Sequence, residues 1–234
     1  MKVDEQLINV SLNNDSDIKK IDSIIEKYDP QVIEISGCPG TGKTTLVKKL
    51  KGKYKDKYVD YFDIREEHFK IFDKNISILP SYLLFVLKNI PLHYTIFKSL
   101  KKNKLENLKT FSYYIFQFEF ELKKVNGKFI IRDEPLFQLF FVRKYHHKND
   151  VGDMRTLIKM LNKKYYKNIK VINIHLIEDN VENILKKRIN RNRINVDNNK
   201  SKKCLKKEVL SYKENIYNYR FRIRYNLFVN IELD

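Results

Sequence analysis

Eight consecutive residues, 37–44, have the spacing of a phosphate-binding loop, with glycine at the first and sixth positions followed by lysine and threonine. The glycines allow backbone N–H groups to turn inward toward a phosphate. Lys43 would place a positive charge near the β- and γ-phosphates of a nucleotide, and the Thr44 hydroxyl would bind Mg²⁺. We therefore expect ATP and Mg²⁺ here, with contacts from Gly37, Cys38, Pro39, Gly40, Thr41, Gly42, Lys43, Thr44 and Thr45.

The segments on both sides of this loop have the pattern that phosphate binding requires. Residues 31–36 are rich in β-branched side chains and predict a strand, whereas residues 45–50 carry apolar residues at helical spacing. A phosphate would then lie at a helix N-terminus, where backbone N–H groups and the helix dipole favour anions. This context disfavours a chance match of the motif in an unrelated loop.

Two carboxylates follow a second apolar segment, 128–133, that also predicts a strand. Phosphoryl transfer needs an acid that holds Mg²⁺ and a group that positions the nucleophile. We assign Asp133 to the metal, and Glu134 to activating or orienting the nucleophile, although Glu134 also suits a structural helix cap before Pro135. Arg132 has two equal interpretations, a contact to phosphate or substrate and a structural ion pair.

A further carboxylate, Asp63, ends the predicted strand 58–63. The crevice at this strand end lies opposite the phosphate donor, so Asp63 could receive an acceptor hydroxyl or its proton. A solvated loop is the alternative interpretation.

Basic residues gather at 187–193, at the end of a predicted helix and before a long polar stretch. Arginines in a closing lid can neutralise the charge that develops on a transferred phosphoryl group and can exclude water. We predict a lid at about 188–204, with Arg191 and Arg193 as catalytic residues and Arg188 as a nucleotide contact. A solvated basic helix end is the alternative.

These candidate residues are connected by an alternation of strands and helices. The pattern predicts a single α/β domain over 1–234, in which a parallel sheet of about five strands is covered by helices on both faces. The predicted strands are 31–36, 58–63, 128–133, 171–176 and 227–231. The predicted helices are 15–28, one following residue 44, 79–87, 105–124, one opening at 136, 153–161, 181–188 and 206–217.

The composition of the chain limits the classes of partner that we expect the protein to bind. The 234 residues include 47 Lys and Arg against 29 Asp and Glu, a net charge of +18 that is spread along the chain. Such a charge favours a small anionic acceptor over nucleic acid, which needs a concentrated basic patch. Two cysteines are too few for a zinc site or a disulfide framework, and we expect a cytoplasmic protein. The apolar stretch 78–97 is interrupted by proline and lysine, so we expect a buried helix there and no membrane span.

Taken together, the loop 37–44, Asp63, the pair Asp133-Glu134 and the arginines of 188–193 resemble the P-loop kinases of the thymidylate-kinase and deoxynucleoside-kinase group. The resemblance covers roughly residue 31 to the C-terminus. It implies the P-loop kinase fold, ATP-dependent transfer to a nucleoside or nucleotide, and site roles for Asp133, Glu134, Arg191 and Arg193. The strand-end sequence differs, because the group usually has Asp-Arg or Glu-Arg-Ser where this chain has Asp-Glu-Pro.

Three questions stay open at this stage. The acceptor could be a glycan or a nucleic-acid end, the donor could be GTP, and a homodimer is compatible with the sequence. The main rival function is a regulatory or mechanical P-loop ATPase. The long interval between Lys43 and Asp133 has room for two helices of an acceptor-side lobe, and this favours a kinase.

Overall fold

A computed structural model describes most of the chain. The described residues are 4–9, 15–38, 40–55, 57–60, 78–100, 104–124, 128–133, 154–178, 180–189, 206–207, 209–210 and 227–232.

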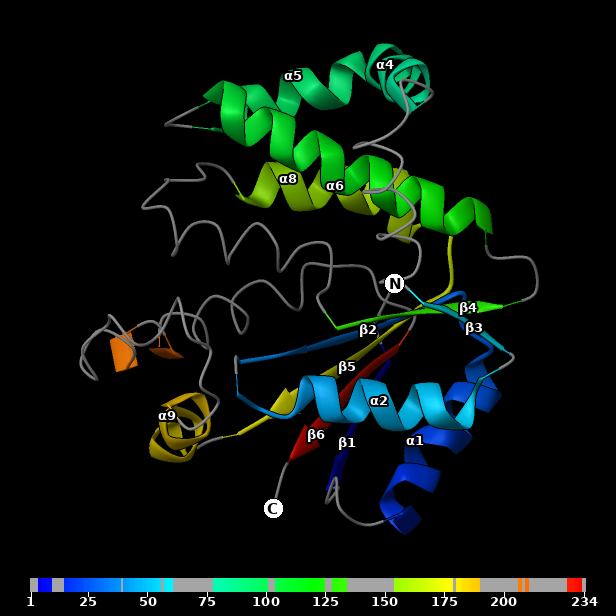
Figure 1. Ribbon diagram of the computed structural model, residues 1–234, viewed down its shortest axis with the longest axis vertical. Helices are drawn as coiled ribbons and strands as arrows, with labels where there is room; N and C mark the ends of the chain where they lie inside the picture. The colour runs from blue at the N-terminus through cyan, green and yellow to red at the C-terminus, as the bar shows by residue number, and fades with distance from the viewer. Residues whose placement is uncertain are drawn as a thin grey trace.

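The centre of the molecule is a parallel sheet of six strands in the order β1-β6-β5-β2-β4-β3 (Figure 1). The α/β class and the parallel sheet are as predicted, but the number of strands, about five, was wrong. The additional strand is β1, a polar edge strand that pairs only with β6, so its sequence lacks the apolar run of a central strand. The strands are β1 Asp4–Asn9, β2 Val32–Gly37, β3 Tyr58–Asp60, β4 Phe129–Arg132, β5 Val171–Ile177 and β6 Leu227–Glu232.

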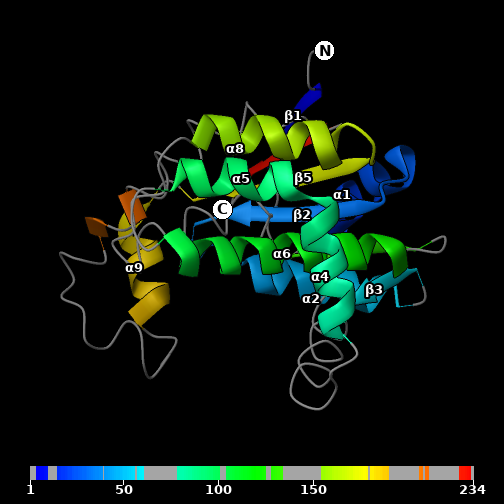
Figure 2. The same cartoon turned by 90° about the horizontal axis from the view of Figure 1, so that it is seen from above.

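Helices cover both faces of the sheet, as predicted. Figure 1 shows α1 and α2 on one face, with α6 and α8 on the other and α4 and α5 beyond them. Figure 2 shows α5 running alongside α6 and α8, with which it is in contact. The helices are α1 Asp15–Tyr28, α2 Lys43–Lys53, α4 Ile78–Lys88, α5 Ile90–Ser99, α6 Lys104–Lys124, α8 Met154–Leu161 and α9 Val181–Ile189.

Successive side chains of the strands point to opposite faces of the sheet, so the hydrophobic core has two parts, one on each face. On the α1–α2 face, Ile33 and Ile35 of β2 pack with Leu46 and Leu50 of α2. On the opposite face, the preceding residue Val32 packs with side chains of α6 and of the π-helical turn η1 (Asn162–Tyr166), which continues α8. This division follows from the two-residue period of a strand, which sends successive side chains to opposite faces.

The apolar stretch 78–97 forms two helices where the sequence predicted one buried helix. The break falls at Asn89, whose side-chain Nδ2 donates to the Phe85 carbonyl at 2.7 Å, and Pro91 occupies the first turn of α5. Proline lacks an N–H and therefore suits the start of a helix better than its interior. Only one face of α4 is buried, so the prediction of a buried helix is correct for that face and wrong for the other. Within the described part of the chain, no helix combines the length and apolar character needed to cross a membrane.

Other predicted elements can be compared only in part. The helices at 15–28, 105–124, 153–161 and 181–188 are confirmed to within a residue or so at each end. Of the helix predicted at 206–217, residues 206–207 and 209–210 are described and helical. The helix predicted from 136 and the end of the strand 58–63 lie outside the described residues.

Candidate functional site

The phosphate loop, residues 37–44, follows the central strand β2 and leads directly into α2. At Gly37, φ is +143°, and an added Cβ would lie 2.8 Å from both the Leu176 carbonyl oxygen and Thr41 Oγ1. No L side chain fits such a contact without a shift of the backbone. Gly42, with φ of +89°, is the N-cap of α2. The loop therefore needs glycine where its backbone turns and where β5 approaches it.

Hydrogen bonds within the loop hold Lys43 across its opening. Lys43 Nζ donates to the carbonyl oxygens of Gly37 at 2.8 Å and Cys38 at 3.0 Å. Thr41 closes the turn, since its backbone N–H and its Oγ1 both donate to the Cys38 carbonyl, at 3.2 and 2.9 Å. The ammonium group is thus positioned at the end of the sheet where the loop begins.

The start of α2 has the electrostatics of an anion site. Its first turn contains no acidic residue, so no carboxylate of that turn offsets the positive end of the helix dipole. Thr41 is buried, whereas Thr44 and Thr45 are exposed. The exposed Thr44 hydroxyl is accessible to a metal ion, and the buried Thr41 is committed to the loop itself.

Asp133 comes directly after β4, the hydrogen-bonded neighbour of β2. Because the two strands are parallel, Asp133 and the phosphate loop lie at the same edge of the sheet. Neighbouring strands are about 4.8 Å apart, with no strand between these two. Asp133 is half-buried. A hydroxyl and a carboxylate oxygen are ligands that Mg²⁺ accepts, so Thr44 and Asp133 fit the expected metal.

The arginine before Asp133 is buried on the other side of the strand. Arg132 Nη1 lies 3.7 Å from Glu121 Oε2 of α6, and its guanidinium lies 4.9 Å from the centre of the Phe118 ring. Both charged side chains are buried. Of the two interpretations of Arg132, this placement supports the structural ion pair, which joins α6 to the strand that ends at Asp133.

Burial dominates the electrostatics of this ion pair. It raises the pKa of Glu121 to about 7 from its ordinary value of 4.5, despite the opposing effect of Arg132, and the nearby Glu34 adds to the increase. Removal from water thus outweighs the attraction of a partner at 3.7 Å.

A row of polar side chains on the same face was missed by the sequence analysis. Ser36, immediately before the phosphate loop, donates through Oγ to Asn173 Oδ1 at 2.7 Å and lies 2.9 Å from His175 Nδ1. Because the Asn173 oxygen can only accept, His175 Nδ1 donates its proton to Ser36 Oγ. Tyr166 OH donates to Glu34 Oε1 at 2.9 Å. The sequence feature that could have revealed this row is the polar residues at alternate positions of otherwise apolar strands.

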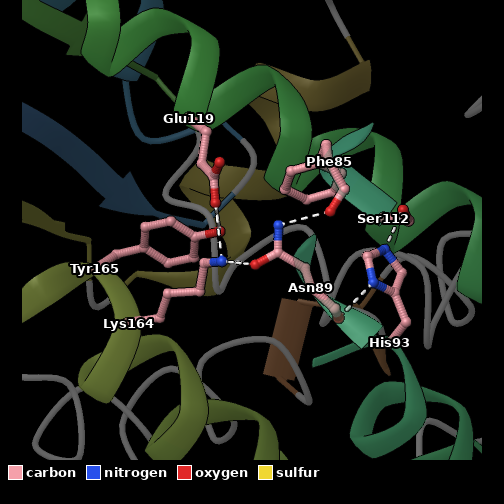
Figure 3. Close-up of polar contacts among 7 residues, drawn as sticks. All are labelled: Phe85, Asn89, His93, Ser112, Glu119, Lys164 and Tyr165. Carbon is pink, nitrogen blue, oxygen red and sulfur yellow. Dashed lines mark hydrogen bonds and ion pairs between the residues drawn. The ribbon is translucent and has the colours of Figure 1, made fainter. Parts of the chain in front are cut away.

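A second polar network, shown in Figure 3, joins the helices farther from the sheet. Glu119 of α6 accepts from Tyr165 OH at 2.7 Å and forms an ion pair with Lys164 at 3.0 Å. Lys164 also donates to Asn89 Oδ1 between α4 and α5. The polar contacts therefore connect α6 and η1 with the break between α4 and α5.

His93 forms a second arm of this network. Its Nδ1 lies 2.7 Å from the Asn89 carbonyl and therefore carries the proton, so Nε2 accepts from Ser112 Oγ at 2.6 Å. Burial is the main reason that the pKa of His93 is lowered. The imidazole is therefore held neutral between α5 and α6.

The helix that precedes the predicted lid in the sequence, α9, packs against the loop 37–44. Cys38 is buried in a small apolar cluster with Ile184 and Leu185 of α9 and with Val209. Cys38 is thus a packing residue, and the backbone of Arg188 belongs to the last turns of α9. Pro39, Asp63, Glu134, Arg191 and Arg193 lie outside the described residues.

Compared with models of known protein families and with curated protein sequences, the chain gives no match. The function is therefore inferred from the site alone.

Proposed function

We propose that the protein is an ATP-dependent phosphotransferase that moves the γ-phosphoryl group to a hydroxyl or phosphate of a small anionic acceptor, with nucleosides and nucleotides as the favoured class. One observation carries the proposal. Lys43 Nζ lies across a glycine-dependent loop at the start of α2, and that loop follows a strand whose direct neighbour ends at Asp133. This combination places a positive charge, a helix N-terminus and a carboxylate at one edge of the sheet.

Each side chain has a proposed role. Lys43 binds the β- and γ-phosphates and stabilises the charge that spreads over the transferred group. Thr44 and Asp133 would hold Mg²⁺, which supplies charge neutralisation between the phosphates. Glu134 orients or activates the acceptor, and Asp63 receives it on the opposite side of the crevice. Arg188, Arg191 and Arg193 close over the phosphates as a lid.

Two features favour a kinase over a plain ATPase. The helices α4, α5 and α6 all lie between β3 and β4 in the sequence, with α6 on the sheet face beside the strand of Asp133 and α4 and α5 packed beyond it (Figure 1). That layer is joined by buried polar contacts, which define the positions of its helices more closely than apolar packing does. A substantial, ordered lobe beside the phosphate loop is expected of an enzyme that must position a second substrate.

The deciding experiment is transfer of label from γ-labelled ATP to a panel of nucleosides, nucleotides, sugars and oligonucleotides. We expect one class to be labelled by the wild type, and Lys43→Ala to reduce transfer by on the order of 10²-fold or more. Lys48→Ala is the matched control, because Lys48 is exposed on the same helix. Equal transfer by Lys43→Ala and Lys48→Ala, with both folded, would remove the phosphate-loop mechanism.

The lid is tested separately. Replacing Arg191 and Arg193 together with alanine should lower transfer by roughly 10²-fold and change ATP affinity much less, since the arginines act on charge that develops during transfer. Hydrolysis of ATP by the wild type should be slow without an acceptor. Rapid hydrolysis that no acceptor stimulates would favour the ATPase.

A further inference from the structure

The largest group of exposed apolar side chains lies on α4 and α5. Among the large hydrophobic residues that the described part of the chain leaves exposed, all but Leu105 and Leu210 belong to these two helices. They are between 51% and 66% exposed: Leu83, Leu84, Leu87, Ile90 and Tyr94. We call these five residues the α4–α5 patch.

Helical spacing shows that α4 is apolar on two opposite faces. Tyr82, Phe85 and Val86 pack into the core with α6. Leu83, Leu84 and Leu87 lie at intermediate positions that project to the other side. Ile90 and Tyr94 of α5, beyond the break at Asn89, lie one turn apart on that helix. One apolar face of α4 is thus covered by the chain itself, and the other faces outward.

The charged residues of α4 and α5 have one sign. Residues 78–99 contain no Asp or Glu, and Lys88 and Lys98 are exposed in the last turns of α4 and α5. Two further lysines, Lys101 and Lys102, follow in the sequence. A second copy of this chain, which carries +18, would bring lysines against lysines. An anionic surface would be attracted by both exposed lysines of these helices.

We propose that the α4–α5 patch docks on an anionic lipid bilayer. Leu83, Leu84, Leu87 and Ile90 enter the boundary between headgroups and acyl chains, Tyr94 lies at headgroup depth, and Lys88 and Lys98 meet lipid phosphates. In Figure 1, α4 and α5 form the end of the molecule opposite α1 and α2, so the phosphate loop and α2 stay in water. Docking is peripheral, and it does not depend on the proposed kinase activity.

The test is sedimentation with large vesicles of phosphatidylcholine alone or with added phosphatidylserine. We expect binding to the anionic vesicles, weakening as salt increases. Leu83→Ser with Leu87→Ser should weaken it about tenfold or more, because apolar burial is lost. Lys88→Glu with Lys98→Glu should weaken it by at least about fivefold per lysine. The changed side chains are exposed, so all variants should retain wild-type thermal unfolding.

The control pair is Lys19→Glu with Lys48→Glu, exposed lysines of α1 and α2 at the other end of the molecule. It changes net charge by the same amount and should alter binding less than threefold, roughly the effect of long-range charge alone. Equal loss from both lysine pairs would overturn the proposal in favour of diffuse attraction. Absence of vesicle binding, or a dimer in sedimentation equilibrium that the serine variant abolishes, would overturn it in favour of another occupant.

Discussion

The two faces of the sheet are covered by different kinds of contact, mainly apolar packing on one and polar networks on the other. On the α1–α2 face, isoleucines of three strands pack against Leu46 and Leu50 of α2 in a mainly apolar core, beside which the buried Asp22 of α1 forms an ion pair with Lys53 of α2. On the α4–α8 face, the same strands bury Glu34, Arg132 and Asn173 within hydrogen-bond or ion-pair networks. The apolar packing around Leu46 and Leu50 contains no group that titrates near neutral pH. The polar face gains defined positions for its helices but carries charges that titrate.

If the protein has the proposed activity, this difference between the two faces serves its function. The loop that binds phosphate needs a rigid support, which close packing provides. The lobe that positions an acceptor benefits from polar contacts, because these specify one arrangement of α4, α5, α6 and η1. The predictions below test this contrast, from the largest expected effect on the free energy of unfolding to the smallest.

Leu46→Ala tests the apolar face. Leu46 is buried in the centre of that core, so removing its side chain leaves a cavity and should lower the free energy of unfolding by about 2–5 kcal/mol. The loss should be the same at pH 5.5 and pH 8 in urea titrations. The exposed Lys48→Ala on the same helix should change stability by less than about 0.5 kcal/mol. A strongly pH-dependent loss would contradict the contrast.

Glu121→Gln tests the polar face. Because the folded-state pKa of Glu121 is raised from 4.5 to about 7, the folded protein holds this proton more tightly than the unfolded chain does. The resulting stability is fully present below pH 4.5 and is lost as pH rises through about 7, a change of about 3 kcal/mol. Glutamine cannot titrate, so the variant should lose this falling slope.

Urea unfolding at pH 4.5 to 8 measures that slope, with the exposed Glu106→Gln on the same helix as control. The lowered pKa of His93 contributes with the opposite sign, because the unfolded chain takes up a proton below the ordinary pKa and stability falls toward acid pH. The comparison of Glu121→Gln with wild type cancels this contribution. Identical slopes in the two proteins would show that Glu121 titrates normally.

Gly37→Ala and Gly52→Ala compare two glycines at opposite ends of the loop–α2 unit. At Gly37 the new Cβ would collide with the Leu176 carbonyl and Thr41 at positive φ, so we expect a loss of about 1–3 kcal/mol together with weaker ATP binding. At Gly52, within α2, nothing lies within 4 Å of the new Cβ, and alanine should stabilise by about 0.5–1 kcal/mol. Calorimetry with and without ATP measures both effects. The same sign of change at both positions would refute the geometry.

Tyr165→Phe should have the smallest effect. It removes the hydrogen bond to Glu119 but leaves the ion pair between Glu119 and Lys164, so we expect a loss of about 0.5–1.5 kcal/mol. Tyr94→Phe, at an exposed position, should have almost no effect. A loss at Tyr165 above about 3 kcal/mol would mean that the network of Figure 3 acts as one cooperative unit.

The amino-acid sequence by itself determined the local features of this protein. The prediction of a phosphate-binding loop needed only the glycines and Lys43 within eight residues, and the flanking strand and helix, which the structure contains, follow from short periodic patterns. The α/β class followed from the alternation of such elements. The functional roles of all the candidate site residues stay predictions, and Asp63, Glu134, Arg191 and Arg193 also lie outside the described residues.

Only the tertiary structure decided which distant residues meet. Arg132 pairs with Glu121, and Ser36 with Asn173 and His175, because of strand order and because alternate side chains of β2, β4 and β5 share a face. No short pattern encodes that order, since it depends on how the whole sheet pairs. The same holds for α4, whose two apolar faces look alike in sequence: packing against α6 covers one of them and leaves the other exposed.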